Sequence, residues 1–95
     1  MPMDRTIRIG LIGDFEPVQR AHQAIPRAVE LATADLGLRA ELTWLPTVEV
    51  EHQGEAALAD FDGLWCVPGS PYESMDGALH GIRFARERGK PFVGT

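Results

Sequence analysis

The sequence predicts a single α/β domain built around a parallel sheet, and three observations lead to that prediction. Short apolar runs that stop at Gly or Pro alternate with longer segments in which apolar residues recur every three or four positions. Their order is strand, helix, strand, weak helix, strand, helix, strand, which requires parallel strands joined by right-handed crossovers. The chain has 95 residues, enough for one domain and too few for two.

The first strand and the first helix lie in the N-terminal third of the chain. The run Ile7–Gly13 is apolar and ends at a Gly-Asp pair, which predicts a strand buried on both faces. Pro17 suits the first turn of the helix that follows, and Gly37 supplies a left-handed cap at its end. Pro26 should kink or split this helix, leaving a main part from Pro26 to Leu36. Its expected inward face consists of Val18, Ala21, Ile25, Ala28, Ala32 and Leu36.

The middle of the chain predicts two more strands. The run Ala40–Leu45 alternates polar and apolar residues and ends at Pro46, as expected of a strand near a sheet edge. Within the less informative stretch 48–60, the segment Glu55–Ala59 predicts one or two helical turns. The run Leu64–Val67 predicts a third strand, which is buried.

The last third of the chain predicts a helix and a fourth strand. Ser74 is the expected N-cap of a helix that ends at Gly89, with Asp76 in its first turn and arginines toward its last. Pro91–Val93 is the fourth strand, and the sequence stops two residues later. We therefore expect a domain truncated after its fourth strand. The expected inward face of the helix consists of Met75, Ala78, Leu79, Ile82 and Ala85.

Composition excludes several classes of function. Nine Lys and Arg against fourteen Asp and Glu give a net charge of −5, which argues against nucleic-acid and anionic-membrane partners. No apolar run approaches the ~18 residues of a membrane span, and the N-terminus lacks a signal peptide, so we expect a cytoplasmic protein. The three histidines lack metal-ligand spacing and no phosphate-binding glycine motif occurs, so we expect neither a metal nor a cofactor.

Candidate functional residues should follow the carboxyl ends of the strands, where ligands bind in open parallel sheets. In the segment that follows the third strand, the backbone N–H groups of Gly69 and Ser70 could form an anion-binding pocket; the alternative is an ordinary strand-to-helix turn. Cys66 is expected to be a buried, inert thiol. His22 is expected on a helix flank, in a local packing role.

Several blocks of the sequence together resemble class I glutamine amidotransferase domains. Phe61–Gly69 is similar to the family's turn, strand and Pro-Gly-Gly loop, and Pro91–Thr95 is similar to the strand that leads to its nucleophile. Gly77–Leu79 and Ile82–Glu87 are similar to the intervening helix. Within the family the chain resembles the glutaminase half of CTP synthase, and a related group that lacks the synthetase domain. Three further blocks resemble this related group in particular: Gly13–Phe15, Ala21–Pro26 and Pro68–Tyr72.

This resemblance implies a flavodoxin-like, three-layer fold of which residues 1–95 are the N-terminal portion. It places Gly69 and Ser70 at the oxyanion loop and Tyr72 near the glutamine pocket, with Ser70 replacing the family's second glycine. The full-length form would act as a hydrolase on glutamine, supplying ammonia to the ligase step of CTP and pyrimidine biosynthesis. The family's Cys-His-Glu triad has no counterpart here, because the nucleophile would follow Thr95, so we expect no catalytic residue and no activity from this chain alone.

Two interpretations remain open. The position of the stop suggests an in-frame UGA decoded as selenocysteine; a truncated product or a pseudogene is the alternative, and the nucleotides after the codon of Thr95 distinguish them. In place of an enzyme fragment, the chain could also be a non-catalytic binding or oligomerisation module. It would then associate with a partner, or with itself, through an uncovered sheet edge.

Overall fold

The structure is a computed structural model that describes residues 5–68 and 72–95. Strands and helices alternate along these residues, as expected for a parallel α/β fold. The elements are β1 (Arg5–Ile12), α1 (Arg20–Leu36), β2 (Leu38–Leu45), α2 (Thr47–Gln53), the short 3-10 helix η1 (Gly54–Ala57), β3 (Gly63–Cys66), α3 (Met75–Arg88) and β4 (Phe92–Gly94).

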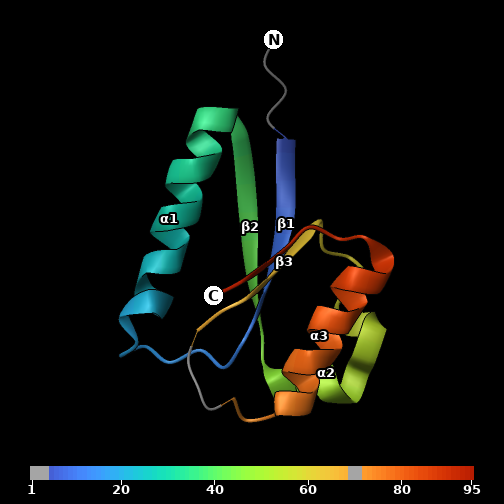
Figure 1. Cartoon of the computed structure of the whole chain (residues 1–95). Coiled ribbons are helices and arrows are strands. Elements are labelled where there is room, and N and C mark those ends of the chain that lie inside the picture. Colours follow the sequence, from blue (N-terminus) through green and yellow to red (C-terminus); the bar gives the residue numbers. More distant parts are fainter. Residues whose placement is uncertain (1–4, 69–71) are drawn as a thin grey trace.

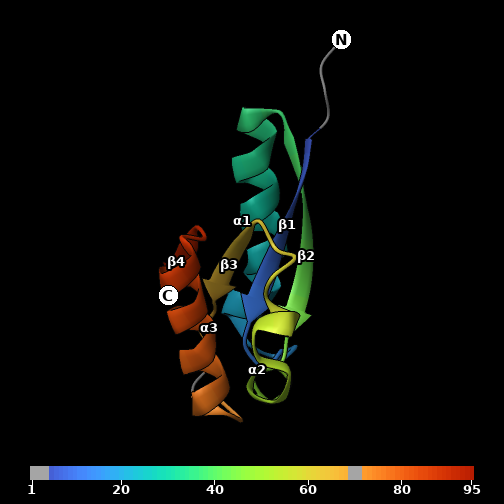
Figure 2. The same ribbon diagram turned by 90° about the vertical axis from the view of Figure 1, so that its right-hand side faces the viewer.

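The described strands form one parallel sheet in the order β2-β1-β3-β4. β1 pairs with β2 along its whole length, from Arg5 opposite Leu38 to Ile12 opposite Leu45, and only its second half pairs with β3. Helix α1 covers one side of the sheet, while α2 and α3 lie beside each other on the opposite side (Figures 1 and 2). The chain therefore has the flavodoxin-like, three-layer α/β topology that the sequence predicts.

Helix α1 differs from its prediction in three respects. It begins at Arg20, because a turn closed by the Gln19 N–H and the Glu16 carbonyl comes first, and it continues through Pro26 without a break. A single proline removes one helical hydrogen bond, and packing on either side of Pro26 maintains the helix. The predicted inward face was largely wrong, since Val18 and Leu36 are exposed. The buried residues are His22, Ile25, Val29 and Thr33.

Helix α3 has the predicted ends but a different buried face. Ser74 is its N-cap, and Gly89, at φ 66°, is its left-handed C-cap. The predicted inward residues Met75, Leu79 and Ile82 are exposed. Two glycines replace them at the interface, because the absence of a side chain lets the helix approach its neighbours closely. The buried residues are Gly77, Ala78, Gly81, Phe84 and Ala85.

The weakly predicted middle segment forms more helix than expected. Only Glu55–Ala59 was expected to be helical, whereas α2 starts earlier, at Thr47, directly after β2, and η1 follows it. In α2, Thr47 and Val50 are buried and the other side chains are exposed, so this short helix shows little apolar periodicity. Its position depends on contacts with α3.

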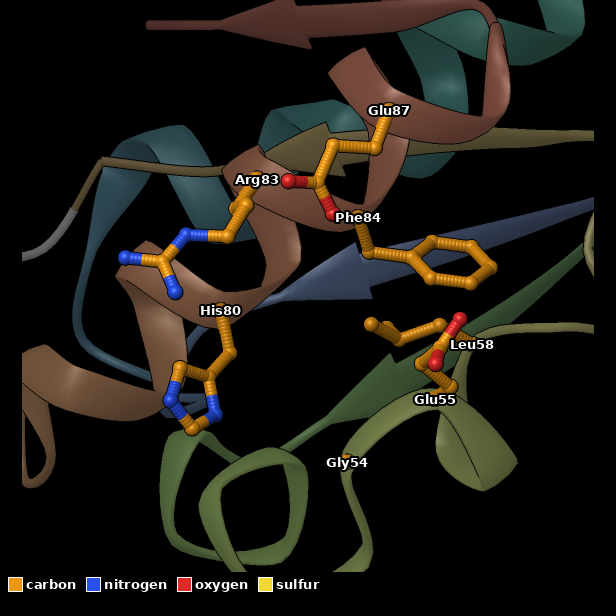
Figure 3. Close-up of a pocket in the computed structure, with 7 residues that line it drawn as sticks. All are labelled: Gly54, Glu55, Leu58, His80, Arg83, Phe84 and Glu87. Atoms are coloured by element: carbon orange, nitrogen blue, oxygen red, sulfur yellow. The ribbon is translucent and has the colours of Figure 1, made fainter.

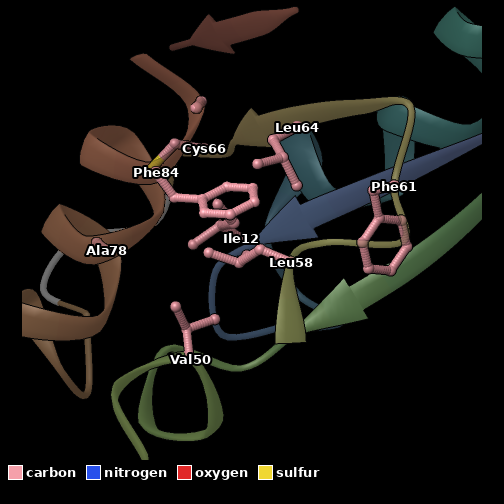
Figure 4. Packing of buried hydrophobic residues seen from close by; sticks show 9 residues of the cluster. Ile12, Val50, Leu58, Phe61, Leu64, Cys66, Ala78 and Phe84 are labelled. Carbon is pink, nitrogen blue, oxygen red and sulfur yellow. The ribbon is translucent and has the colours of Figure 1, made fainter. Parts of the chain in front are cut away.

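Alternation along the strands separates two apolar clusters. Leu11 and Val67 face α1 and pack with Ile25 and Val29. Ile12 faces the other side, where the residues labelled in Figure 4 pack between the sheet, α2 and α3. That larger cluster consists of Ile12, Val50, Leu58, Phe61, Leu64, Cys66, Ala78, Phe84 and Ala85.

None of the helices in the described ranges is long and apolar enough to span a membrane.

Candidate functional site

The carboxyl ends of the parallel strands bring three chain segments together at one edge of the sheet. Asp14 follows β1, Thr47 follows β2 and begins α2, and Pro68 follows β3. β1 pairs with β2 on one side and with β3 on the other. After β1 the chain first forms β2 and then returns past β1 to form β3, so the strand order reverses between β1 and β3. Such a switch point is the usual ligand-binding position in this class of fold.

Asp14 joins these segments through its half-buried carboxylate. Its Oδ1 accepts a hydrogen bond from the Thr47 backbone N–H at 2.9 Å. Its Oδ2 accepts one from the Thr47 hydroxyl at 2.9 Å and one from the Glu73 backbone N–H at 2.8 Å. Hydrogen bonds to an ionised acceptor are stronger than neutral ones, so this carboxylate ties the start of α2 to the segment that precedes α3.

Ser74 extends this network into α3. Its backbone N–H donates to the hydroxyl oxygen of Thr47 at 2.8 Å, and the Thr47 side chain is fully buried. Its own hydroxyl accepts from the Gly77 N–H at 3.0 Å, as an N-cap does, and donates to Glu51 Oε1 at 2.6 Å. The hydroxyl groups of Thr47 and Ser74 therefore each donate one hydrogen bond and accept another, and they join the start of α2 to the start of α3.

Tyr72 precedes α3, and its side chain is hydrogen-bonded to the backbone just after β3. Its hydroxyl donates to the Val67 carbonyl at 2.7 Å, and the Cys66 Sγ lies 3.4 Å from its oxygen. Since the single phenolic proton is used at Val67, the thiol of Cys66 is the donor of the second bond. Burial raises the pKa of Tyr72 to about 12, reinforced by the hydrogen bond to Cys66 and by electrostatic interactions with Cys66 and Asp14 that disfavour the phenolate.

The structure describes only some of the predicted site residues. Gly69 and Ser70 lie outside the described residues. Tyr72 does lie at the carboxyl edge of the sheet, with its hydroxyl bonded to the backbone of its own loop. Cys66 is buried, as predicted, on the α3 side of the sheet.

Three residues that the sequence did not single out prove to be structurally central at this edge: Asp14, Thr47 and His22. The first two stand directly after strands, a position that could have identified them as candidates. His22 was expected on a helix flank in a local packing role. The packing role is confirmed, since the residue is only 1% exposed and contacts the backbone of two loops.

A separate hollow of about 220 Å³ lies between η1 and α3, away from this edge (Figure 3). Its charged side chains are exposed, and Glu55 also pairs with Arg88. It shares no residue with the Asp14 network. Across residues 5–68 and 72–95, no group of three or more His, Cys, Asp or Glu side chains is placed to hold a metal ion. The hollow is lined by Gly54, Glu55, Leu58, His80, Arg83, Phe84 and Glu87.

Comparison with known proteins relates the chain to one enzyme. No family model matches it. It is 34% identical over 89 residues to the CTP synthase of Synechococcus sp. (strain JA-3-3Ab), a match that covers 93% of this chain and 16% of the relative. It is 32% identical over 96 residues to the CTP synthase of Methanothrix thermoacetophila, covering 93% of this chain and 18% of the relative. For the CTP synthase of Sulfurisphaera tokodaii the identity is 29% over 93 residues, covering 96% and 18%.

The chain spans less than a fifth of the length of these curated relatives. The similarity is distant but extends over almost the whole chain, and it agrees with the parallel α/β topology. The chain is therefore homologous to one region of CTP synthase.

Proposed function

We propose that this chain forms the glutamine-binding part of a glutamine amidotransferase domain of the CTP synthase kind. In the full-length form such a domain would hydrolyse glutamine and supply ammonia. The observation that supports this most is the anchoring of the two residues directly before α3. The backbone N–H groups of Glu73 and Ser74 are bonded to Asp14 and Thr47, beside the switch point of the sheet.

The roles of the individual residues follow from this proposal. The backbone N–H groups of Gly69 and Ser70 would donate to the oxyanion that develops on the glutamine amide. Tyr72 would act indirectly, because its hydroxyl is already bonded to the Val67 carbonyl and braces the strand that carries the loop. Asp14 would likewise hold the loop and make no contact with glutamine, since both of its oxygens accept bonds from the protein.

We propose further that the chain binds glutamine without turning it over. A glutamyl thioester requires an accessible thiolate with a neighbouring base. Cys66 is the chain's only cysteine, is buried, and donates its thiol proton to Tyr72. It cannot reach a ligand at the carboxyl edge of the sheet.

Titration of the isotope-labelled chain with L-glutamine, followed by NMR, tests the binding. Amide resonances of Val67, Tyr72 and Glu73 should move, while those around the hollow of Figure 3, such as Arg83, should not. L-Glutamate, which carries a carboxylate in place of the amide, is the matched control ligand. An ammonia assay on the same sample should remain at background.

Two results would contradict the proposal. Shifts confined to the hollow between η1 and α3, or none up to the solubility of glutamine, would remove the glutamine site. Ammonia release by pure protein, lost in a Cys66→Ala variant, would show that the buried thiol is catalytic after all.

A second candidate function is self-association, favoured by an apolar hollow on the sheet. It has a volume of about 370 Å³ and lies on the face of β1, β3 and β4 that turns toward the α1 side, next to the β4 edge of the sheet. Val93 within it is 53% exposed. A second copy would present the same apolar face and the same edge strand, so a two-fold pairing would bury both at once. The lining includes Ile7, Ile9, Trp65, Pro91 and Val93.

Sedimentation velocity over a range of concentrations tests this second function. If copies pair through the hollow, Val93→Glu should give a monomer. Leu31→Glu is the matched control, because Leu31 is similarly exposed at 56% but lies on α1, outside the hollow. A wild-type chain that stays monomeric at all concentrations, or equal effects of the two variants, would dismiss self-association through this face.

A further inference from the structure

β2 is an edge strand, and apolar residues carry its outward backbone groups. In the described sheet, ordered β2-β1-β3-β4, its one neighbour is β1. The Gly13 N–H donates to the Leu45 carbonyl at 3.1 Å, so the backbone groups of Leu45 point toward β1. Because these groups alternate in direction along a strand, those of Leu38, Ala40 and Leu42 point away from β1. Such an outward row of donors and acceptors is what an added strand pairs with.

The outer side of β2 is accessible to a second strand. Figure 2 shows α1 behind β1, and no described helix runs along the outer side of β2. A hollow of about 430 Å³ separates α1 from β2, and its lining includes Val29, Leu38, Ala40 and Leu42. The three β2 residues are only half-buried, whereas Leu11 on the central strand β1 is fully buried. An added strand would cover the apolar row that α1 leaves half exposed.

The charged residues of β2 are complementary to a second copy of the same strand. Arg39 and Glu41 are exposed and stand on either side of Ala40. Charged residues often protect an edge strand from pairing. Here their signs are opposite, so an antiparallel copy centred on Ala40 places Arg39 opposite Glu41 at two contacts. In the same register Leu38 lies opposite Leu42.

The hydrogen-bonding pattern of β2 agrees with this register. Antiparallel strands alternate between pairs that exchange two hydrogen bonds and pairs that exchange none, whose side chains lie closer together. Since the backbone groups of Ala40 point outward, Ala40 and its copy form a hydrogen-bonded pair. Arg39 and Glu41 then occupy the closer pairs, where opposite charges stabilise and like charges destabilise. Centring the pair on Arg39 or on Glu41 would instead set like charges opposite each other.

We propose that two copies of the chain pair antiparallel along β2, about a two-fold axis at Ala40, and so join their sheets into one. A contact of this kind uses the same surface of both copies, as two-fold dimers do. The paired residues 38–42 begin β2, whereas Thr47 and its bond to Asp14 follow the end of that strand. The inference is therefore independent of the proposed glutamine site. It is an alternative to association through the apolar hollow next to β4.

Charge reversal, followed by sedimentation velocity, tests this pairing. Arg39→Glu sets glutamates opposite each other at both contacts, and Glu41→Arg does the same with arginines. Each variant should associate about tenfold more weakly than the wild type, or weaker still. An equimolar mixture of the two variants restores opposite charges and should associate like the wild type, as should the double variant Arg39→Glu/Glu41→Arg.

Two variants control for the change in net charge. Arg20→Glu and Glu87→Arg make the same charge changes at exposed positions on α1 and α3, away from β2. Both should associate like the wild type.

Amide hydrogen exchange locates the contact within the chain. The amides of Ala40 and Leu42 bond to the second copy in the dimer, so their exchange should slow about tenfold or more as the protein concentration rises. The amide of Glu41 points toward β1 and should show no such dependence. Val93→Glu, which alters the hollow next to β4, should leave this protection unchanged.

Three results would overturn the inference. The first is a wild-type chain that stays monomeric at all concentrations. The second is a monomeric Val93→Glu variant, which would assign the association to the hollow next to β4. The third is a mixture of Arg39→Glu and Glu41→Arg that associates no better than either variant alone, because opposite charges across β2 would then have no role.

Discussion

Replacing Gly77 by alanine tests how the carboxyl edge of the sheet is assembled. Gly77 lies in the first turn of α3, where the helix passes close to the start of α2. A Cβ at this position would lie 1.8 Å from the Thr47 carbonyl oxygen and 2.7 Å from its carbonyl carbon. Both atoms belong to the backbone, so no side-chain rotation can relieve the overlap.

The expected cost follows from two opposing effects. Alanine at a helical position gains about 1 kcal/mol over glycine. To restore a 3.0 Å contact, the Thr47 carbonyl would have to retreat by more than about 1 Å, and overpacking that displaces backbone costs about 3 kcal/mol or more. The net loss should therefore be about 2 kcal/mol or more, from a total of about 5–14 kcal/mol for a chain of this length. In a domain of this size, that loss lowers the Tm by roughly 10 °C.

Urea unfolding followed by circular dichroism measures this loss, with Gly81→Ala as the control. Gly81 is also buried on α3, but a Cβ there would meet the Ile12 Cδ1 at 2.4 Å, which is the end of a flexible side chain. Its net effect should lie within about 1 kcal/mol of zero, because the same gain in helix propensity applies. Displacement of Thr47 in Gly77→Ala should also shift the amide resonance of Glu73, which is bonded to the same Asp14.

The reasoning would be refuted if Gly77→Ala unfolded at the wild-type urea concentration or above it. Equal destabilisation by Gly81→Ala would also refute it, because the loss would then come from filling the α3 interface in general and not from the backbone of Thr47.

Three further outcomes are expected. The phenol of Tyr72, the only tyrosine, should titrate at about pH 12, above the value of 10.0 for an unfolded chain. The protonated phenol therefore stabilises the folded chain fully below pH 10.0, and this contribution is lost as the pH rises through about 12. Tyrosinate absorbance measures this, and a midpoint near 10.0 in a chain still folded by circular dichroism would contradict it. Asp14→Asn places an amide N–H where Oδ2 accepts from the Glu73 N–H, and should lower the free energy of unfolding in urea by about 1–3 kcal/mol. An unchanged urea midpoint would show that these hydrogen bonds contribute nothing to stability. Ser74→Ala removes the acceptor of the Gly77 N–H and should lower the free energy of unfolding by about 1 kcal/mol, whereas Ser74→Thr keeps a hydroxyl and should lower it much less. Equal losses in the two variants would show that the N-cap bond is not the cause.

Much of the fold could be predicted because its signals are local. The first strand, expected at Ile7–Gly13, spans Arg5–Ile12, and the last helix has both of its predicted caps, Ser74 and Gly89. Caps and strand ends depend on the residues at those positions, and Gly and Pro mark them clearly. The candidate site was predicted less well. Tyr72 lies at the carboxyl edge of the sheet and its place near a glutamine pocket stays a prediction, while the hydrogen bonds of Asp14 and Thr47 that join the segments at this edge were missed.

The sequence by itself determined the alternation of strands and helices, and with it the parallel sheet and the edge where its loops meet. Only the tertiary structure decided which faces of the helices are buried. Gly77 and Gly81 show why: a residue without a side chain adds nothing to an apolar pattern, yet allows the closest approach between elements. The bonds of Asp14 to Thr47 and Glu73 join residues 33 and 59 positions apart. No local pattern encodes such pairings, because they exist only once the strands have brought their ends together.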